Sequence, residues 1–217
     1  MHMNRAIDLY TESEYRGYPV MTQIGPLDRS YLDRAYRTLK SAWDQYPWLL
    51  GIRCELCFPQ GWVFHPESYT NEKMEQFIAS LKAQIVAHQS KLMRQGSRVH
   101  PCTLRYIWAR EYTRDGRPHY HVVLLLNHHA FFTLGTFEEG RDNLYNRINQ
   151  AWASALGVPA SAVYGLVHFD ADMPVIAVEG HDDQKGFAEL LRRTSYLCKY
   201  DTKGYARWEH CFGTSRK

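Results

Sequence analysis

The sequence predicts an α+β fold, in which a central antiparallel sheet of about five strands is covered by helices. Short runs of β-branched, aromatic and aliphatic residues are bounded by turn residues, as strands are. Longer segments between them carry apolar residues at helical spacing. Two of the strand-like runs are joined by a tight turn, which pairs them antiparallel. At 217 residues the chain can form one sizeable core built from such layers.

The first half of the chain opens with a polar, irregular segment over residues 1–26. A helix is expected over 28–46, because Asp28 is a favourable N-cap and apolar residues follow at helical spacing. A strand over 49–58 and a helix over about 71–95 come next. The helical spacing over 28–46 is carried by Tyr31, Ala35, Leu39 and Ala42.

A hairpin follows, with strands over 103–112 and 119–127 and an Asp-Gly pair in the turn between them. A helix over 142–156 ends at Gly157, a residue favoured just after a helix. Two more strands are expected over 162–170 and 175–179, and a last helix over about 183–200.

The hairpin carries a candidate metal site. Side chains alternate along a strand, so His119 and His121 point to one face and Tyr120 to the other. Glu111, near the end of the partner strand, can face both imidazoles. This donor set suits Mg²⁺, Mn²⁺ or Zn²⁺. Alternatively, the histidines are two half-buried polar residues, or His168 takes the place of Glu111.

A second candidate site lies at the end of the last helix. Tyr196, Tyr200 and Lys203 are spaced i, i+4 and i+7, so a helix places them on one face, with Lys199 beside them. The tyrosines can also be core aromatics with satisfied hydroxyls. Two lysines within the same two turns argue against that alternative, because lysine is almost never buried unpaired.

The two motifs together resemble the HUH endonucleases, nickases that start rolling-circle replication. His119 and His121 match the family's His-hydrophobic-His motif, and Glu111 matches the third metal ligand of many initiators. Tyr196 and Tyr200 match the paired tyrosines of its two-tyrosine class, with Lys199 between them. The chain is most similar to inovirus-type initiators and their prophage relatives. The strand over 49–58 looks like the family's first strand but carries no diagnostic residue.

The resemblance covers roughly residues 45–205 and implies an endonuclease domain over 46–217, with residues 1–45 packed on it. It implies that DNA is nicked and rejoined through a 5′-phosphotyrosine, with Mg²⁺ or Mn²⁺ as cofactor, to initiate replication of a phage or prophage. The expected substrate is a single-stranded origin. No P-loop motif is present, so a separate host helicase is expected beside a polymerase.

Basic residues are concentrated around the two motifs, although the net charge is only +3. The stretches 94–117 and 192–217 are basic, whereas 170–183 is acidic and should face away from DNA. From the basic stretches we take Arg110, Arg117, Arg193 and Lys203 as candidate DNA contacts.

The five scattered cysteines predict free thiols in a reducing compartment. Cys54 and Cys57 are three apart in a strand, so they should face opposite sides and not bind zinc together. Without a signal peptide or a membrane-spanning run, a cytoplasmic protein with no membrane partner is expected. Two other functions stay open: a related transposase or relaxase-like strand transferase, and a non-catalytic DNA-binding regulator with the same fold.

Overall fold

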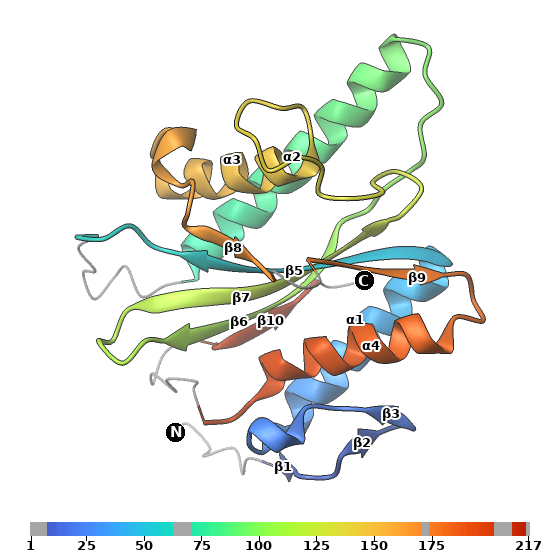
Figure 1. Ribbon diagram of the computed structural model, residues 1–217, viewed down its shortest axis with the longest axis vertical. Helices are drawn as coiled ribbons and strands as arrows, with labels where there is room; N and C mark the ends of the chain where they lie inside the picture. The colour runs from blue at the N-terminus through green and yellow to red at the C-terminus, as the bar shows by residue number, and fades with distance from the viewer. Residues whose placement is uncertain (1–7, 63–70, 171–173, 202–209, 216–217) are drawn as a thin grey trace, which may run out of the picture.

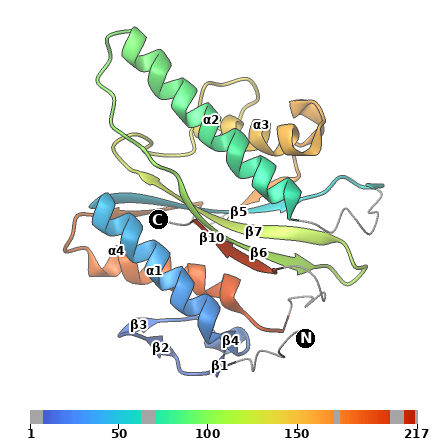
Figure 2. The same ribbon diagram turned by 180° about the vertical axis from the view of Figure 1, so that it is seen from behind.

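The computed structural model describes residues 8–62, 71–170, 174–201 and 210–215. Three layers are visible in Figures 1 and 2: helices α2 and α3 on one face of the sheet, the sheet itself, and helices α1 and α4 on the other face. The predicted α+β class with a central antiparallel sheet is confirmed. The helices are α1 (Arg29–Gln45), α2 (Glu72–Arg94), α3 (Leu144–Leu156) and α4 (Gln184–Ser195).

The main sheet has six strands where about five were expected, and all of its pairs are antiparallel. β5 and β7 pair at the centre, β6 and then β10 follow on one side, and β8 and β9 both pair with the other side of β5. The additional strand is β10, at the edge. The strands are β5 (Trp48–Cys57), β6 (Arg105–Tyr112), β7 (Pro118–Asn127), β8 (Val167–Phe169), β9 (Val175–Glu179) and β10 (Phe212–Thr214).

The segment expected to be irregular, residues 1–26, contains short ladders where the structure describes it. β1 pairs with β4, β2 pairs with β3, and a 3-10 helix spans Thr22–Ile24. These elements lie against α1 and α4, below the main sheet in Figure 1. The strands are β1 (Leu9–Tyr10), β2 (Glu14–Tyr15), β3 (Tyr18–Pro19) and β4 (Leu27–Asp28).

Several local signals act as the sequence predicts. The Asp28 carboxylate accepts hydrogen bonds from the backbone N–H groups of Ser30 and Tyr31 and so caps α1. Gly157 ends α3 in the left-handed conformation, with φ 71°. Gly116, in the β6–β7 turn, also has a positive φ, which a side chain would strain.

Two sequence-predicted boundaries are wrong. The strand expected over 162–170 is reduced to Val167–Phe169, because Ala160–Ala162 forms a 3-10 helix and turns follow it. The last helix ends at Ser195 and continues only as a 3-10 turn, Tyr196–Cys198.

Each face of the sheet has its own apolar core. Leu56, Tyr120 and Val122 belong to the core beneath α2 and α3, whereas Val123 and Leu125 belong to the core beneath α1 and α4. Alternation along β7 therefore divides its side chains between two layers.

Helix α4 approaches the sheet closely at Gly51 of β5. A Cβ added there would lie 2.4 Å from Cδ1 of Leu190. This contact brings the C-terminal end of α4, and the residues after it, to the face that carries His119 and His121. Among the described residues, no helix is both long enough and apolar enough to cross a membrane.

Candidate metal and tyrosine site

The site is built on three neighbouring strands. In the register of the sheet, His121 of β7 lies opposite Glu55 of β5, and His119 lies opposite Glu111 of β6. Residues directly opposite each other point to the same face, so the four polar side chains gather on one surface. That surface is the one covered further along by α1 and α4.

Glu55, His119 and His121 form a triad of metal-ligand geometry. Their ligand atoms all lie within 4.8 Å of one another. The two Nε2 atoms are 3.3 Å apart, and Glu55 Oε1 is 3.5 Å from His119 Nε2. Ligand atoms about 2.1 Å from one divalent ion lie about 3.0 to 3.4 Å from their neighbours in octahedral and tetrahedral geometry. The triad therefore fits such an ion with little movement.

Burial favours the neutral form of His119, which is the form that binds a metal. Desolvation, and then the neighbouring His121, lower the pKa of His119 below its usual value. A neutral imidazole offers a lone pair, whereas an imidazolium offers none. Its Nδ1 is buried and has no hydrogen-bond partner among the described residues.

Glu111, the expected third ligand, stands beside the triad and not within it. Its Oε2 lies 3.6 Å from His121 Nε2 and also 3.6 Å from the Lys199 ammonium. The carboxylate is almost fully buried and links the histidine surface to the segment after α4.

Sequence reasoning missed Glu55, although a signal was present. Along β5, Arg53, Glu55 and Cys57 alternate with the apolar residues Cys54 and Leu56. Alternation of that kind indicates one apolar and one polar face of the strand. What no local pattern supplies is the register that sets Glu55 opposite His121.

Tyr196 lies directly against the triad. Its ring centroid is 5.3 Å from that of His121, at an interplanar angle of 82°. The Lys199 ammonium lies 3.3 Å from the phenol oxygen, and the Arg53 guanidinium lies 4.4 Å from the ring centroid. Two cations thus stand beside a half-buried tyrosine at the edge of the metal-ligand cluster.

The helical stripe expected to align the two tyrosines does not form. Lys199 has φ −55° and ψ 137°, which is outside helical geometry. The chain turns toward β4 at this point: Lys199 pairs with Leu27, and the Tyr200 N–H donates to the Pro26 carbonyl. Tyr200 is therefore not one helical turn beyond Tyr196. Lys203 lies outside the described residues.

The other three expected DNA contacts occupy different settings. Arg117 is exposed in the hairpin turn, where its Nε lies 3.3 Å from Asp115. Arg110 is wrongly expected at the surface: it is almost fully buried on the α2 face, where it donates to Asn71. Strand alternation places it on the face opposite Glu111.

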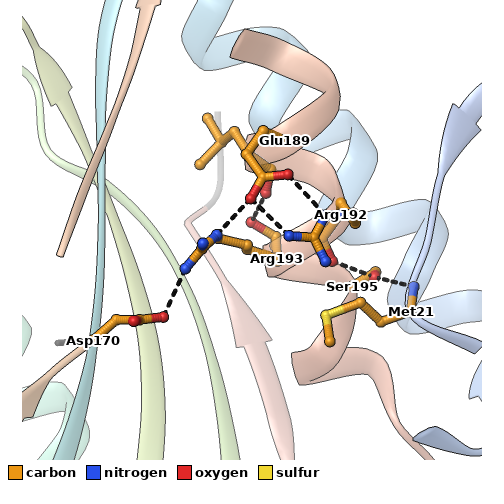
Figure 3. A network of polar contacts seen from close by, with 8 residues as sticks. Met21, Asp170, Glu189, Arg192, Arg193 and Ser195 are labelled. Atoms are coloured by element: carbon orange, nitrogen blue, oxygen red, sulfur yellow. Dashed lines mark hydrogen bonds and ion pairs between the residues drawn. The ribbon is translucent and has the colours of Figure 1, made fainter. Parts of the chain in front are cut away.

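Arg193 is held in a polar network at the end of α4 (Figure 3). Its Nε lies 2.6 Å from Glu189 and its Nη1 lies 2.7 Å from Asp170, just after β8. Arg192 pairs with the same glutamate. The network ties α4 to the sheet edge and already supplies Arg193 with two carboxylates.

A small cavity of about 150 Å³ opens beside the triad. Glu55, His121, Arg53 and His168 line part of it. His168, the alternative ligand, lies opposite Glu55 in β8 and is exposed, but it is not part of the triad. The cavity gives this side of the site a direct opening.

The five cysteines are free, as expected. Cys54 packs in the core beneath α2 and α3, whereas Cys57 lies on the site face with its Sγ 3.7 Å from Glu55. The pair therefore faces opposite sides. Burial, and then Glu55, raise the pKa of Cys57 to about 12.

Comparison with known proteins shows to which family the chain belongs. A model of the YagK/YfjJ C-terminal domain matches residues 10–215. The chain belongs to this family. YagK of Escherichia coli K12 is 32% identical over 179 residues, covering 80% of this chain and 86% of YagK. YfjJ of the same strain is 35% identical over 115 residues, covering 52% of this chain and 55% of YfjJ. No solved structure matches the chain.

Proposed function

We propose that the protein is an HUH-type endonuclease, which cuts and rejoins single-stranded DNA through a covalent bond to Tyr196. We further propose that it initiates rolling-circle replication of a phage or prophage, with a separate helicase and polymerase as partners. The observation that carries the proposal is the contact of the Tyr196 ring with His121, beside both the triad and the Lys199 ammonium.

The geometry of the triad supports the proposal that the site binds a divalent ion such as Mg²⁺ or Mn²⁺. Its two imidazoles and one carboxylate lie at the spacing of atoms that share one ion, and the pKa of His119 is lowered toward the neutral form. When bound, such an ion would offset charge on the scissile phosphate and leave coordination positions for its oxygens. Three protein ligands leave those positions open.

The chain's own residues supply the nucleophile and its electrostatic support. The Tyr196 phenol loses its proton to solvent and its oxygen attacks the phosphorus, so that a tyrosyl oxygen–phosphorus bond forms and the bond to the 3′ oxygen breaks. The leaving 3′ oxygen takes up a proton and becomes a free hydroxyl. The Lys199 ammonium stabilises the negative phenolate, and Glu111 holds that ammonium in place.

The reverse reaction rejoins the strand. The 3′-hydroxyl gives up its proton to solvent and attacks the phosphotyrosine, the phosphodiester forms again, and Tyr196 leaves as phenolate. One phosphoester bond replaces another at each step, so no ATP is needed. The cavity beside Glu55 and Arg53 opens directly onto the triad.

Covalent trapping tests the proposal. The protein is incubated with Mn²⁺ and a randomised library of single-stranded 40-nucleotide DNA, and adducts that survive denaturing gels are collected. We expect an adduct with the wild-type protein, none with EDTA and none with Tyr196→Phe. Tyr36→Phe, a matched change in α1, should form the adduct normally. Absence of any wild-type adduct, or an undiminished adduct in Tyr196→Phe, would contradict the proposal.

A further inference from the structure

Strand β10 is an edge strand of the described sheet and lies between α2 and α1 (Figure 2). A groove lined by residues of β10, α1 and α2 crosses this edge. It consists of two adjoining cavities of about 850 and 200 Å³, and Arg34, Arg105, Thr214 and Ser215 line both. We call these joined cavities the edge groove. The larger cavity faces α2, and the smaller one faces α1.

The edge groove is rich in positive charge. Arg37 from α1, Lys82 from α2 and Arg105 from β6 line it together with Arg34. Among the described lining residues, Glu75 is the one carboxylate. A cavity wall with four cations and one carboxylate attracts an anionic ligand.

Three of these cations contact neutral groups. Arg37 donates to the backbone carbonyl of Asp33, and Arg105 donates to the side-chain carbonyl of Gln45. The Lys82 ammonium lies 5.4 Å from the ring centroid of Tyr106. Within the described part of the chain, none of the three forms an ion pair with a carboxylate.

This separates them from two of the DNA contacts expected from the sequence. Arg193 is held by two carboxylates and Arg117 by one. A cation already paired in this way gains less from a phosphate than one bonded only to neutral groups. The edge groove therefore offers a ligand three cations that have no carboxylate partner among the described residues.

The remaining groups favour an unpaired strand. Tyr106 is half-buried and lines the larger cavity, where an aromatic face can stack on a base. Hydroxyls of Thr214 and Ser215 can donate to phosphate oxygens. A cationic groove with an aromatic wall is the combination that binds single-stranded nucleic acid.

β6 joins the edge groove to the triad. Arg105 lies at the groove and Glu111 at the site, six residues apart on one strand. At about 3.4 Å per residue, the separation is about 20 Å. A stacked single strand with about 3.4 Å per nucleotide would span it with about six nucleotides.

We propose that the edge groove binds the phosphate backbone of single-stranded DNA about six nucleotides from the scissile phosphate. The proposal rests on the proposed function for its choice of substrate. It adds a second contact region, which holds the strand while the triad and Tyr196 act on it.

Binding without cleavage provides the test. Fluorescence anisotropy measures the affinity of the full chain for a labelled 20-nucleotide oligothymidylate in EDTA. Arg37→Gln with Lys82→Gln removes two groove charges, one from α1 and one from α2. We expect Kd to rise about tenfold, and the slope of log Kd against log salt to fall by about 1.4.

A matched control removes the same charge from the same two helices. Lys40→Gln with Lys91→Gln alters two lysines that pair with Asp44 and Asp142, outside the groove. We expect its Kd to stay within twofold of wild type. Thermal unfolding of both variants checks that the fold is intact.

The edge-groove proposal would be overturned by no binding of the oligothymidylate, by equal losses in both variants, or by equal affinity for a blunt-ended DNA duplex of the same length or for a labelled polyglutamate peptide. Failure of the proposed function is distinguishable. If the proposed function is wrong, the oligothymidylate still binds through the edge groove, but no covalent adduct forms with the wild-type protein. Conversely, if an adduct forms on Tyr196 but the groove variants bind the oligothymidylate as tightly as wild type, only the edge-groove proposal is refuted.

Discussion

At the hairpin end of β7, the two faces of the sheet differ in chemistry although they share one backbone. Tyr120 points to the α2 and α3 face and packs near Phe58, Trp108 and Trp152. Its neighbours along the strand, His119 and His121, point to the other face and meet Glu55 and Glu111. One face is closed by large apolar rings, whereas the other gathers ionisable groups.

The contrast separates residues that stabilise the fold from residues that serve the candidate site. The aromatic face shows that these strand positions can be filled by an apolar core. Buried ionisable groups weaken a fold unless they are well paired, so the polar face adds little stability of its own. We infer that its residues serve binding and chemistry, and the following experiments test that division.

The largest effect is expected on the aromatic face. Trp152 is fully buried, and its indole N–H donates to the Cys57 carbonyl. Trp152→Ala should lower the free energy of unfolding by about 3 to 5 kcal/mol, since it leaves a large cavity. His119→Ala with His121→Ala should change it by about 1 kcal/mol or less. Urea unfolding followed by fluorescence and circular dichroism compares them; equal losses would refute the division.

Chemistry should depend on the polar face instead. Lys199→Met should lower the rate of adduct formation about 100-fold, because a single positioned charge beside developing negative charge contributes on that order. Lys199→Arg, which keeps the charge, should recover part of the rate. Gel quantification of the adduct over time measures both, and an unchanged rate in Lys199→Met would remove the lysine from the mechanism.

Acid should destabilise the fold through α4, the helix that leads to Tyr196. The Arg192 side chain, helped by Arg193, lowers the pKa of Glu189 to about 2, against about 4.3 for a free glutamate. A lowered pKa stabilises the fold above the unfolded-state value, and this stabilisation is lost as pH falls from about 4.3 to 2.

Glu189→Gln should therefore cost about 1 kcal/mol at pH 7, a value reduced for partial solvent exposure. The difference from wild type should shrink markedly at pH 3. Urea unfolding at the two pH values provides the measurement. A difference that stays constant between them would contradict the assigned role of the Arg192 and Arg193 pairs.

The smallest effect is expected at Tyr200. The chain leaves helical geometry at Lys199, so this phenol does not share the face of Tyr196. Tyr200→Phe should keep the first adduct within about twofold. The resemblance to two-tyrosine initiators predicts that Tyr200 performs a second transfer, and the yield of closed circles tests this. Loss of the first adduct in Tyr200→Phe would contradict the assignment of Tyr196 as the residue that attacks first.

Local signals in the sequence were sufficient for most of the framework. The Asp28 cap, the Asp-Gly turn and Gly157 act through neighbouring residues, so their elements appear where expected. Alternation alone also brings His119 and His121 together. Applied to β6, the same rule would have moved Arg110 to the face opposite Glu111.

What the sequence could not supply depends on contacts between distant segments. Glu55 joins the histidines through the pairing of β5 with β7, a register that no local pattern encodes. The short strand β10 exists because it pairs with β6. The helix after 183 stops early because the chain turns to pair Lys199 with Leu27.

The most direct test of the account is a calorimetric titration with Mn²⁺ of wild type, Glu55→Gln and Glu111→Gln. Both substitutions remove one carboxylate charge from the same surface. We expect one ion per chain in the wild type, at least about tenfold weaker binding in Glu55→Gln, and a smaller loss in Glu111→Gln, because only Glu55 lies within the triad. Binding unchanged in Glu55→Gln, or abolished only in Glu111→Gln, would contradict the assignment of the metal ligands.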